Sequence, residues 1–548
     1  MFLLWATVFV VYLGLRSHTF FSSLVHDDGL FLYAGQALAN GELPYEGFWD
    51  HKPPCIFFFH SIPFYFFPFS LAAAKLHEIL WLSFAALLLF YFCQRRFHRL
   101  TAFAALFFFV FCTSLHYTVR SGGLTEETAL FFVVLCYWQI LRRRGKLGVN
   151  AFIAGLALGA AIEFRQTFVF TSVFLVGALL HNAHQRDKKF KDVLGPFFAM
   201  CAGLAIPEIL ISSYFWIHGG WRDYFEASYL FNLHYIGPAR AKKPLAEILR
   251  IQWEFIQCAG PYLYSPFLTL CTWRWIPTTA RWMTLPLILA FLGDMVAVSL
   301  SGEFYCHYYV QAAVSTTLLL AMFVEGFIEK TKDVRTQGFI ALASLGYAGF
   351  GIILLLLVAV PLYSASLRYL SDYRQILAER NSPLNEYQMQ QSAAQAAKRL
   401  TAPDETILLL GQSPNSVYIY SGRYAGSRYY HYSPIWKLKL RDALKERHIK
   451  LFMEDIQARK PVILFVDLKL PELRELREMD LLEESRLDFL PGFKQYLFDN
   501  YIALEAIWDN IPSEWFWYDV RNIILVRKDK VEEIKARIQR TSDAAAEK

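Results

Sequence analysis

The sequence lacks the cysteine patterns of metal-binding and disulfide-bonded domains. Its 548 residues include eight cysteines, and no two of them form a Cys-x-x-Cys pair. They lie between Cys55 and Cys306, mostly inside apolar runs, where a cysteine behaves as a small buried hydrophobic side chain. Neither a disulfide framework nor a cysteine-ligated zinc site is expected.

Two further common signals are missing, a nucleotide-phosphate loop and a cleavable signal peptide. Gly411-Gln412-Ser413-Pro414 follows an expected strand, but it has neither the glycine spacing nor the Lys-Ser/Thr pair with which such loops bind phosphate. The first apolar run has no basic leader before it and no small-residue cleavage site after it. We therefore expect this run to be retained as a helix.

Charge is scarce for a chain of this length. Charged residues make up 19% of it, and the formal net charge is +6. The positive residues are spread over short loops and form no continuous basic patch, so no nucleic-acid partner is expected. Apolar residues take the place of charge, because 55% of the chain is hydrophobic and 17% is aromatic. This composition predicts a polytopic α-helical membrane protein with room for a second domain.

The apolar residues form runs long enough to cross a bilayer, for which about twenty mostly apolar residues are needed. One boundary is ambiguous, because Glu163 and Arg165 interrupt what would otherwise be one long helix. A charge inside a span is costly and usually faces a cavity or a partner, although a local pair between Glu163 and Arg165 is the plain alternative. About eleven spans are expected, near residues 2–22, 71–93, 101–118, 126–141, 149–165, 166–183, 193–217, 251–273, 282–300, 305–326 and 337–362.

Positive residues fall in alternate loops between these runs. Cytoplasmic loops of membrane proteins are enriched in Lys and Arg, so we expect the basic loops on the cytoplasmic side and the region after Pro361 outside. The basic loops contain Arg95, Arg96 and Arg99; the segment from Arg142 to Lys146; the segment from Arg186 to Lys191; Arg274 and Arg281; and Lys330, Lys332 and Arg335.

One polar stretch, from His26 to Pro54, interrupts the apolar half of the chain. Asp27 and Asp28 open it, and Asp50-His51-Lys52 closes it before two prolines. Carboxylates next to a lysine suit a reaction that pairs a base with an anionic leaving group. We therefore expect a catalytic outer loop over residues 23–70. The simpler alternative is that the aspartates cap one helix and the prolines begin the next.

The order and spacing of these residues resemble the first extracytoplasmic loop of the polyprenyl-phosphate-sugar-dependent glycosyltransferases. The shared features are the Asp-Asp pair after the first helix, the Gly-x-x-Pro-Tyr turn that ends at Tyr45, and Trp-Asp-x-Lys-Pro-Pro from Trp49. The family includes the protein O-mannosyltransferases and the lipid A aminoarabinose transferases, all of the GT-C superfamily. The resemblance covers roughly residues 1–325.

Later segments resemble the same family. Arg165 followed by Gln resembles a Lys/Arg-Gln pair at an outer helix end, and Glu126 resembles the glutamate of a short outer loop. A glutamate in a first helical turn also complements the helix N-terminus, which is the structural alternative. The segment 231–235 and the His-Tyr pair that begins at His307 are similar to two further family segments, although aromatic residues are also common at membrane boundaries.

The resemblance implies roles for the charged residues. Asp27 is the first choice for the base that takes the acceptor proton, and Asp28 is the second. Lys52 and Arg165 are the expected phosphate-binding cations. A base and a cation are the groups that this transfer needs, because the acceptor hydroxyl loses a proton while the departing phosphate gains charge.

The remaining expected site residues bind substrate. Asp50 and Glu126 are expected to orient the acceptor or a metal ion, and Tyr45 and His307 complete the substrate-binding set. No cofactor is firmly implied. A divalent cation is an open alternative, because carboxylates and imidazoles are acceptable ligands. Its candidate ligands are His26, Asp50 and His51.

The composition changes after Pro361, where the chain becomes charged and alternates short apolar runs with helical patterns. This pattern predicts a transmembrane domain over 1–362 and an extracytoplasmic α/β domain over 363–548. The aromatic stretch 416–436 suits sugar stacking or a contact with the membrane domain, and no catalytic constellation is found in this part. Helices are expected near 386–400 and 437–459, and strands at 406–410, 462–466 and 522–526.

The resulting hypothesis is a multi-pass glycosyltransferase of the bacterial cytoplasmic membrane with an extracytoplasmic site. It would move a sugar from a polyprenyl-phosphate donor to a hydroxyl of a lipid, glycan or protein acceptor, with inversion at the anomeric carbon. A transporter or flippase of lipid-linked sugars is the alternative, because charges can also line a substrate path. The internal repeats that would favour a transporter are not seen. An oligosaccharide ligase of the same membrane class, with a long glycan donor, is a third possibility.

Overall fold

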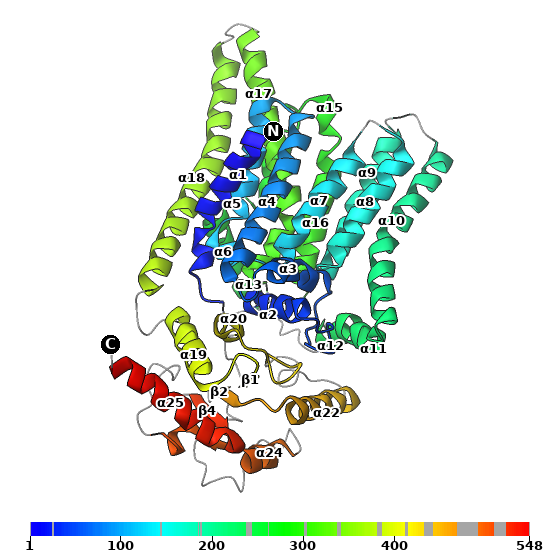
Figure 1. Ribbon diagram of the computed structural model, residues 1–548. Helices are drawn as coiled ribbons and strands as arrows, with labels where there is room; N and C mark the ends of the chain where they lie inside the picture. Colours follow the sequence, from blue (N-terminus) through cyan, green and yellow to red (C-terminus); the bar gives the residue numbers. More distant parts are fainter. Residues whose placement is uncertain are drawn as a thin grey trace.

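The computed structural model shows a helical bundle with a smaller mixed domain at one end (Figure 1). The segment from Asp27 to Pro54, which carries part of the expected site, lies where the two parts meet. The structure describes residues 2–24, 27–142, 145–184, 186, 189–236, 244–260, 262–300, 304–336, 341–380, 386–410, 415–431, 442–467, 492–508 and 522–546.

Apolar helices lie side by side in the bundle. Within the described ranges, six helical stretches are long and apolar enough to cross a bilayer, and four further apolar helices are shorter. The bundle helices are α1 (Phe2–Leu15), α4 (Leu71–Gln94), α5 (Arg99–Cys112), α7 (Thr125–Leu141), α8 (Leu147–Ile162), α9 (Thr171–His184), α10 (Phe190–Ile217), α14 (Ser265–Cys271), α16 (Thr284–Ser299), α17 (Ala313–Thr336) and α18 (Ala341–Arg380).

Each expected span overlaps at least one of these helices, but several ends are shifted, and three of the differences change the layout of the chain. The first helix ends at Leu15, because the next residue, Arg16, is fully buried among polar partners inside the bundle. The run 251–273 is two helices, α13 (Leu245–Ala259) and α14, because Gly260 has a φ of 73° that ends the first. The last apolar helix, α18, continues past Pro361 to Arg380 without a break.

The backbones of α8 and α10 are in direct contact along a row of glycines. A Cβ atom on Gly155 would lie 2.0 Å from the carbonyl oxygen of Met200, and one on Gly203 would lie 2.2 Å from that of Phe152. Gly159 faces α10 in the same way. Small residues permit such close approach of membrane helices, so this seam fixes α10 against the helix that ends beside Arg165.

The basic loops meet at the end of the bundle away from the mixed domain. The Arg96 guanidinium donates to the carbonyl oxygen of Leu141, and Arg186 Nη1 donates to that of Gly145 at 2.9 Å. These hydrogen bonds join three of the expected basic loops. The alternation predicted from Lys and Arg therefore corresponds to one physical end of the bundle.

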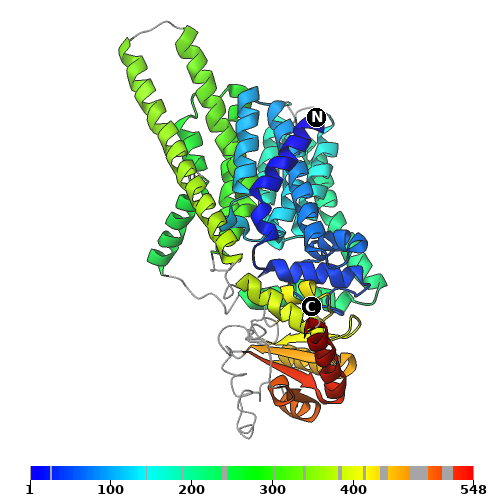
Figure 2. The same ribbon diagram turned by 60° about the vertical axis from the view of Figure 1, so that its left-hand side comes forward.

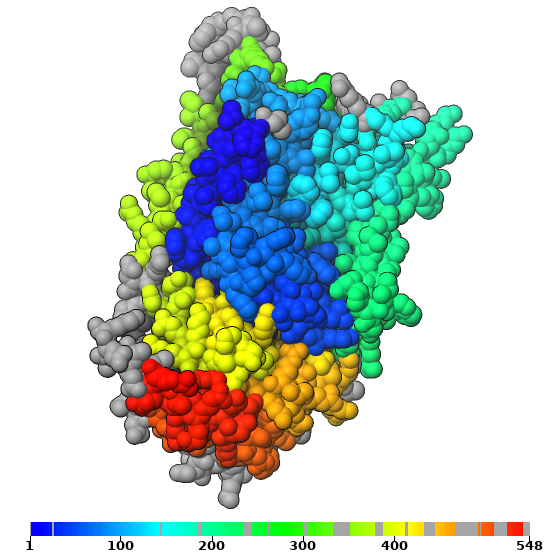
Figure 3. Space-filling model, in the orientation of Figure 1, coloured from blue at the N-terminus to red at the C-terminus, as the bar shows by residue number. Residues whose placement is uncertain are grey.

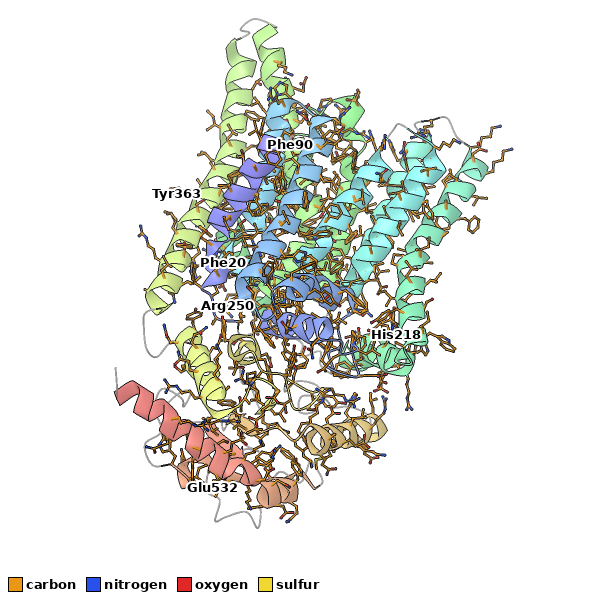
Figure 4. All side chains as sticks on the ribbon, in the orientation of Figure 1. Phe20, Phe90, His218, Arg250, Tyr363 and Glu532 are labelled. Atoms are coloured by element: carbon orange, nitrogen blue, oxygen red, sulfur yellow. The ribbon has the colours of Figure 1, made fainter. Side chains whose placement is uncertain are left out.

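The opposite end is covered by two helices that lie across the bundle axis (Figure 2). They are α2 (Asp27–Ala39) and α3 (Cys55–Phe66), and the turn between them carries Asp50 to Lys52. Gly35 permits their close packing, because a Cβ atom there would lie 2.6 Å from His60. The same end holds His218, labelled in Figure 4 at the end of α10, and the short elements α6 (His116–Val119), α11 (Trp221–Phe225), η3 (Glu226–Leu230) and α12 (Phe231–Ile236).

A four-stranded sheet forms the core of the C-terminal domain, with strand order β1-β2-β4-β3. Strands β1 and β2 are parallel, and β4 is antiparallel to both β2 and β3. The three expected strands and the helix 386–400 are confirmed, whereas β3 was not predicted. The elements are α19 (Glu386–Leu400), β1 (Ile407–Leu410), α20 (Ser416–Ser421), α22 (Asp442–Arg459), β2 (Ile463–Asp467), α24 (Phe493–Asn500), β3 (Tyr501–Ala503), β4 (Asn522–Arg527) and α25 (Val531–Ala546).

The segment 415–431 packs the C-terminal domain onto α2. The Tyr33 ring lies 4.6 Å from the rings of both Tyr418 and Tyr430, and its hydroxyl accepts a hydrogen bond from the Ala425 N–H at 2.8 Å. Figure 3 shows the yellow surface of this domain directly against the blue surface of the early chain. Of the two alternatives for the aromatic stretch, sugar stacking and a contact with the membrane domain, these residues make the contact.

Candidate active site

Asp27 and Asp28 begin α2, and their side chains have different neighbours. Asp28 is only 3% exposed and lies near Tyr420 of the C-terminal domain, whose pKa is raised by burial, by Tyr387 and by Asp28. The Asp27 side chain is 36% exposed, and its Oδ2 lies 3.9 Å from Lys52 Nζ. Both carboxylates complement the helix N-terminus, but only Asp27 also faces the lysine.

The turn from Asp50 to Lys52 is held by contacts from both parts of the molecule. Asp50 Oδ1 accepts the Lys52 N–H at 3.0 Å and lies 3.4 Å from His51 Nδ1. Asp50 Oδ2 lies 3.6 Å from His431 Nε2, which belongs to the C-terminal domain. The carboxyl group therefore lies between one histidine of the loop and one of the domain beneath it.

Burial shifts the ionisation of this turn. It raises the pKa of Asp50 to about 6, with Lys52 acting in the opposite direction and Asp27 in the same one. Burial lowers the pKa of His51 well below its usual value. It also lowers that of Lys52, but Asp27 and Tyr308 outweigh this effect and the pKa of Lys52 is raised. Near neutral pH the turn thus carries a charged lysine and a neutral histidine.

Arg165, which follows α8, reaches Glu126 in the first turn of α7. Its Nη1 lies 2.5 Å from Glu126 Oε1, and its Cζ lies 4.1 Å from the centre of the Tyr308 ring. The other carboxylate oxygen accepts a hydrogen bond from Thr125 Oγ1 at 2.8 Å. His307 Nε2 lies 3.9 Å from Glu126 Oε1. The guanidinium is therefore held by a carboxylate and by an aromatic face.

A second set of hydrogen bonds fixes the other edge of the guanidinium. Arg165 Nε donates to Thr167 Oγ1 at 3.0 Å, and Thr167 donates to Gln311 Oε1 at 2.7 Å. Gln311 in turn donates to Asp294 Oδ1 at 3.3 Å, and Ser315 donates to Asp294 Oδ2 at 2.8 Å. These residues lie on η2 (Gln166–Phe170), η4 (Cys306–Ala312), α16 and α17, so the position of Arg165 is set by the bundle.

A buried ionic network supports the turn before Glu126. Arg16 donates to both oxygens of Glu127 at 3.0 and 3.1 Å, and Glu127 Oε2 accepts the Gly123 N–H at 2.9 Å. Lys75 Nζ lies 3.1 Å from Glu78 Oε1 on α4. All four charged side chains are at most 3% exposed. Buried pairs of this kind require good geometry and further hydrogen bonds, both of which are present here.

Gly123 is the point where this network touches the turn. Its φ is 78°, a conformation that favours glycine. A Cβ atom there would lie 2.4 Å from Glu78 Oε1. Its carbonyl oxygen lies 2.9 Å from His60 Nε2. A larger residue at this position would displace the start of α7 and with it Glu126.

One turn of π-helix, η3, supplies an acceptor to the same region. The Ser228 carbonyl oxygen accepts hydrogen bonds from Gln166 Nε2 at 2.5 Å and from Asn232 Nδ2 at 2.8 Å. Asn232 also donates to the carbonyl oxygen of His51 at 2.9 Å. Single π-turns often occur at functional sites, and this one links α12 to the Asp50–Lys52 turn.

Tyr45 supports Lys52 from the opposite direction. Its hydroxyl donates to the Lys52 carbonyl oxygen at 2.8 Å and accepts from Ser228 Oγ at 3.0 Å. The Tyr45 side chain is fully buried and its φ is 71°. A tyrosine in this conformation is strained, and its packing and hydrogen bonds hold it there.

The structure brings most of the expected site residues together at the end of the bundle that carries α2 and α3. Asp28 is directed to the C-terminal domain instead, and Tyr45 contacts the backbone of the site and not its charges. The residues that share one electrostatic cluster are Asp27, Asp50, Lys52, Glu126, Arg165 and His307.

The proposed local pair between Glu163 and Arg165 is not the arrangement found. Arg165 pairs with Glu126, and the Glu163 carboxyl shares a hydrogen bond with Glu208 of α10. Tyr224 donates to Glu208 at 3.0 Å, and Tyr229 donates to it as well. Glu163 is the C-cap of α8 and meets α10, whereas Arg165, two residues further on, meets the first turn of α7.

The metal alternative gains no support from the described residues. His26 lies outside them. Asp50 and His51 are described, but the part of the chain that the structure covers contains no group of three His, Cys, Asp or Glu side chains placed to hold an ion. No step is assigned to a metal.

Several site residues were not found from the sequence. His431 gave no signal, because its approach to Asp50 depends on how the C-terminal domain docks. Arg16 and Lys75 did give one, since each is a charge within an expected span and such charges face partners. Glu127 was not predicted, because the family motif matches the adjacent Glu126.

Comparisons with known proteins agree with this fold. Residues 51–212 match the family of dolichyl-phosphate-mannose-protein mannosyltransferases. The whole fold is similar to that of ArnT from Cupriavidus metallidurans. Its structure bound to undecaprenyl phosphate gives a TM-score of 0.57 at 12% identity, and its apo structure gives 0.55 at 13%; each comparison covers 95% of this chain and 97% of ArnT. No curated protein sequence matches significantly.

The sequence resemblance and the fold therefore lead to the same class of protein. The family match includes Lys52, Glu126 and Arg165, and it begins after Asp50 in the outer loop. The helical bundle with a small C-terminal α/β domain is confirmed. The chain is a multi-pass membrane protein with the fold of the GT-C glycosyltransferases, and it resembles their polyprenyl-phosphate-dependent members.

Proposed function

We propose that the protein transfers a sugar from a polyprenyl-phosphate donor to a hydroxyl group of an extracytoplasmic acceptor. The observation that carries this proposal is the meeting of Lys52 and Arg165, two fixed cations, with the partly exposed carboxylate of Asp27 at one end of a membrane bundle. A sugar phosphate linked to a lipid would present its charge at this depth, next to the bilayer surface.

The reaction needs one base and a site for a departing phosphate. The acceptor oxygen attacks the anomeric carbon, the bond from that carbon to the phosphate oxygen breaks, and Asp27 takes the hydroxyl proton. Lys52 and Arg165 bind the phosphate as its charge develops. A single displacement inverts the anomeric configuration. Asp28 is the less suitable base, because it is buried beside the C-terminal domain.

The other charged residues have supporting roles. Glu126 holds Arg165 through an ion pair, and His307 lies next to the same carboxylate. Asp50 fixes the Lys52 backbone and lies within the same cluster as Asp27, so it orients the acceptor or the lysine. Tyr45 completes the substrate-binding set through the backbone of Lys52.

The fold and the charge distribution support the donor and the orientation. ArnT has been crystallised with undecaprenyl phosphate, a lipid of the proposed donor class. The basic loops at the far end of the bundle favour a cytoplasmic position for that end. The site and the C-terminal domain then face the outside of a bacterial cytoplasmic membrane, where a lipid, glycan or protein could supply the hydroxyl.

Transfer by purified protein in detergent tests the proposal. Synthetic polyprenyl-phosphate hexose, pentose and aminopentose donors with labelled sugar are supplied together with an envelope extract as acceptor. Asp27→Asn retains shape and the helix-start preference but removes the base, so turnover should fall about a hundred- to ten-thousandfold. Lys52→Met keeps the apolar stem and removes the charge, so donor binding and turnover should both fall.

Asp28→Asn is the matched control for the base. Wild-type rates for Asp27→Asn together with a loss for Asp28→Asn would move the base by one residue. Wild-type rates for all three variants would remove the loop from the mechanism. If the wild-type protein moved lipid-linked sugar across liposomes but transferred none with any donor, the protein would be a transporter.

A further inference from the structure

A single arginine of the C-terminal domain joins that domain to the π-turn next to the site. Arg447, on α22, lies 2.6 Å from Asp223 Oδ1 through Nη2, and its Nη1 donates to Glu226 Oε2. Glu226 is the first residue of η3. One guanidinium that binds two carboxylates is geometrically restricted, so α22 sets the position of the start of the π-turn.

A neighbouring histidine reinforces this contact. His448 Nε2 lies 3.4 Å from Glu226 Oε1, and its Nδ1 lies 2.5 Å from the Tyr429 hydroxyl. Its ring packs edge-on against Trp49, with 5.2 Å between the centroids. Trp49 precedes Asp50, so the side chains of α22 touch both the π-turn and the first residue before the Asp50–Lys52 turn.

Continuous hydrogen bonds lead from the π-turn to the phosphate-binding lysine. Two residues after Glu226, Ser228 donates to Tyr45, which donates to the Lys52 carbonyl oxygen. The Ser228 carbonyl oxygen also accepts from Asn232, whose side chain donates to the His51 carbonyl oxygen. Both routes end on the backbone of the turn and neither passes through a substrate.

We propose that Arg447 positions Lys52 by holding the π-turn η3 in place. The C-terminal domain would thereby set the geometry of the phosphate-binding turn, residues Asp50 to Lys52. This inference rests on the proposed function only for its kinetic consequence. The alternative is that Arg447 merely fastens the domain to the bundle, as the Tyr33–Ala425 contact does.

The test compares Arg447→Gln and Arg447→Lys with Arg537→Gln in the full-length protein. Arg537 is the matched control, because it also pairs with two carboxylates, Glu405 and Glu533, but wholly inside the C-terminal domain. The first readout is amide hydrogen exchange in detergent over residues 45–54. The second is the kcat and donor KM of sugar transfer.

Arg447→Gln should accelerate exchange over residues 45–54 while exchange at Ala425 stays unchanged. It should lower kcat/KM for the donor about a hundredfold, the scale of a misplacement of about 1 Å, and Arg447→Lys should recover part of the loss. Arg537→Gln should lower the melting temperature without changing exchange over 45–54 or the kinetics.

Two results would overturn the inference. Unchanged exchange over 45–54 in Arg447→Gln would show that the π-turn does not transmit its position. If amide exchange accelerated equally over residues 45–54 and at Ala425, Arg447 would only hold the C-terminal domain against the bundle. If the expected exchange pattern appeared but the wild-type protein also transferred no sugar, the proposed function would fail and the positioning of the turn would stand.

Discussion

Arg165 and Glu126 form an ion pair with 2.5 Å between Nη1 and Oε1, although they lie at the ends of two different helices. The Tyr308 ring covers the same guanidinium. A cation held on two sides is in place before a ligand arrives, so in the proposed transfer it would stabilise the developing negative charge without reorganisation.

Replacing Arg165 tests this arrangement. Arg165→Lys keeps a charge but loses the planar fork that contacts Glu126 and Thr167 together. We expect kcat for sugar transfer to fall about a hundredfold. The measurement is transfer in detergent with whichever polyprenyl-phosphate sugar the wild-type protein uses. Arg281→Gln, at the basic end of the bundle, is the control and should leave kcat unchanged. If Arg165→Lys had the same kcat as the wild-type protein, a positive charge at this position would be sufficient without the planar fork of arginine.

Asp50 should give the proposed transfer reaction an acid limb in its pH profile. Because burial raises its pKa to about 6, this carboxyl is already protonated at pH 5, where an ordinary aspartate is ionised. The ionised carboxylate is the better acceptor for the Lys52 N–H that it holds in the proposed site, so kcat/KM should fall as pH drops through about 6. Asp50→Asn should be slow at every pH and lack this limb. An acid limb near pH 4 in the wild-type protein would contradict the assignment.

Gly123 should not tolerate alanine. The left-handed φ costs about 1–2 kcal/mol for a residue with a Cβ atom, and the contact with Glu78 adds about 1–3 kcal/mol. Gly123→Ala should therefore lower the melting temperature and the transfer rate together. Gly177→Ala on α9, where a Cβ atom meets open space, should leave both unchanged or raise stability slightly.

Arg16 should be essential for stability and not for chemistry. Arg16→Met leaves the buried Glu127 without its main partner, which costs about 3–5 kcal/mol. The double variant with Glu127→Leu should recover part of the loss, because no buried charge is then left alone. Thermal unfolding in detergent measures both. No recovery in the double variant would mean that the pair itself, and not the isolated charge, is what stabilises the bundle.

Labelling tests the orientation. In a cysteine-free background, Glu454→Cys in the C-terminal domain should react with an impermeant maleimide in spheroplasts, and Lys332→Cys at the basic end should react only after lysis. Both side chains are about half exposed, at 53% and 52%, so differences report the membrane and not burial. The reverse pattern would place the site on the cytoplasmic side.

The sequence predicted the bundle because apolar runs and basic loops are local signals. The site was predictable only as far as its residues lie in recognisable motifs, such as Lys52 and Glu126. Arg165 was flagged as a charge within an apolar run, but Glu163 remained an open choice of partner, because spacing along a helix does not reveal which neighbouring helix supplies the counter-charge.

Contacts between the C-terminal domain and the bundle could not be predicted from the sequence, because they depend on how the two parts dock. His431 lies in a tyrosine-rich stretch that suited stacking and packing equally, and its approach to Asp50 is a product of docking. Arg447 lies on a largely polar helix, α22, and nothing in its sequence distinguishes an arginine at an interface from a solvated one. The π-turn at Glu226 likewise has no reliable sequence signature.

The glycine contacts between α8 and α10 hold these two helices rigidly together. A Cβ atom added at Gly155 or Gly203 would lie about 2 Å from a carbonyl oxygen of the other helix, so any larger side chain at either position would push the two helices apart. If a long lipid reaches Arg165 in the proposed reaction, we expect the bundle to open along helices other than the α8–α10 pair.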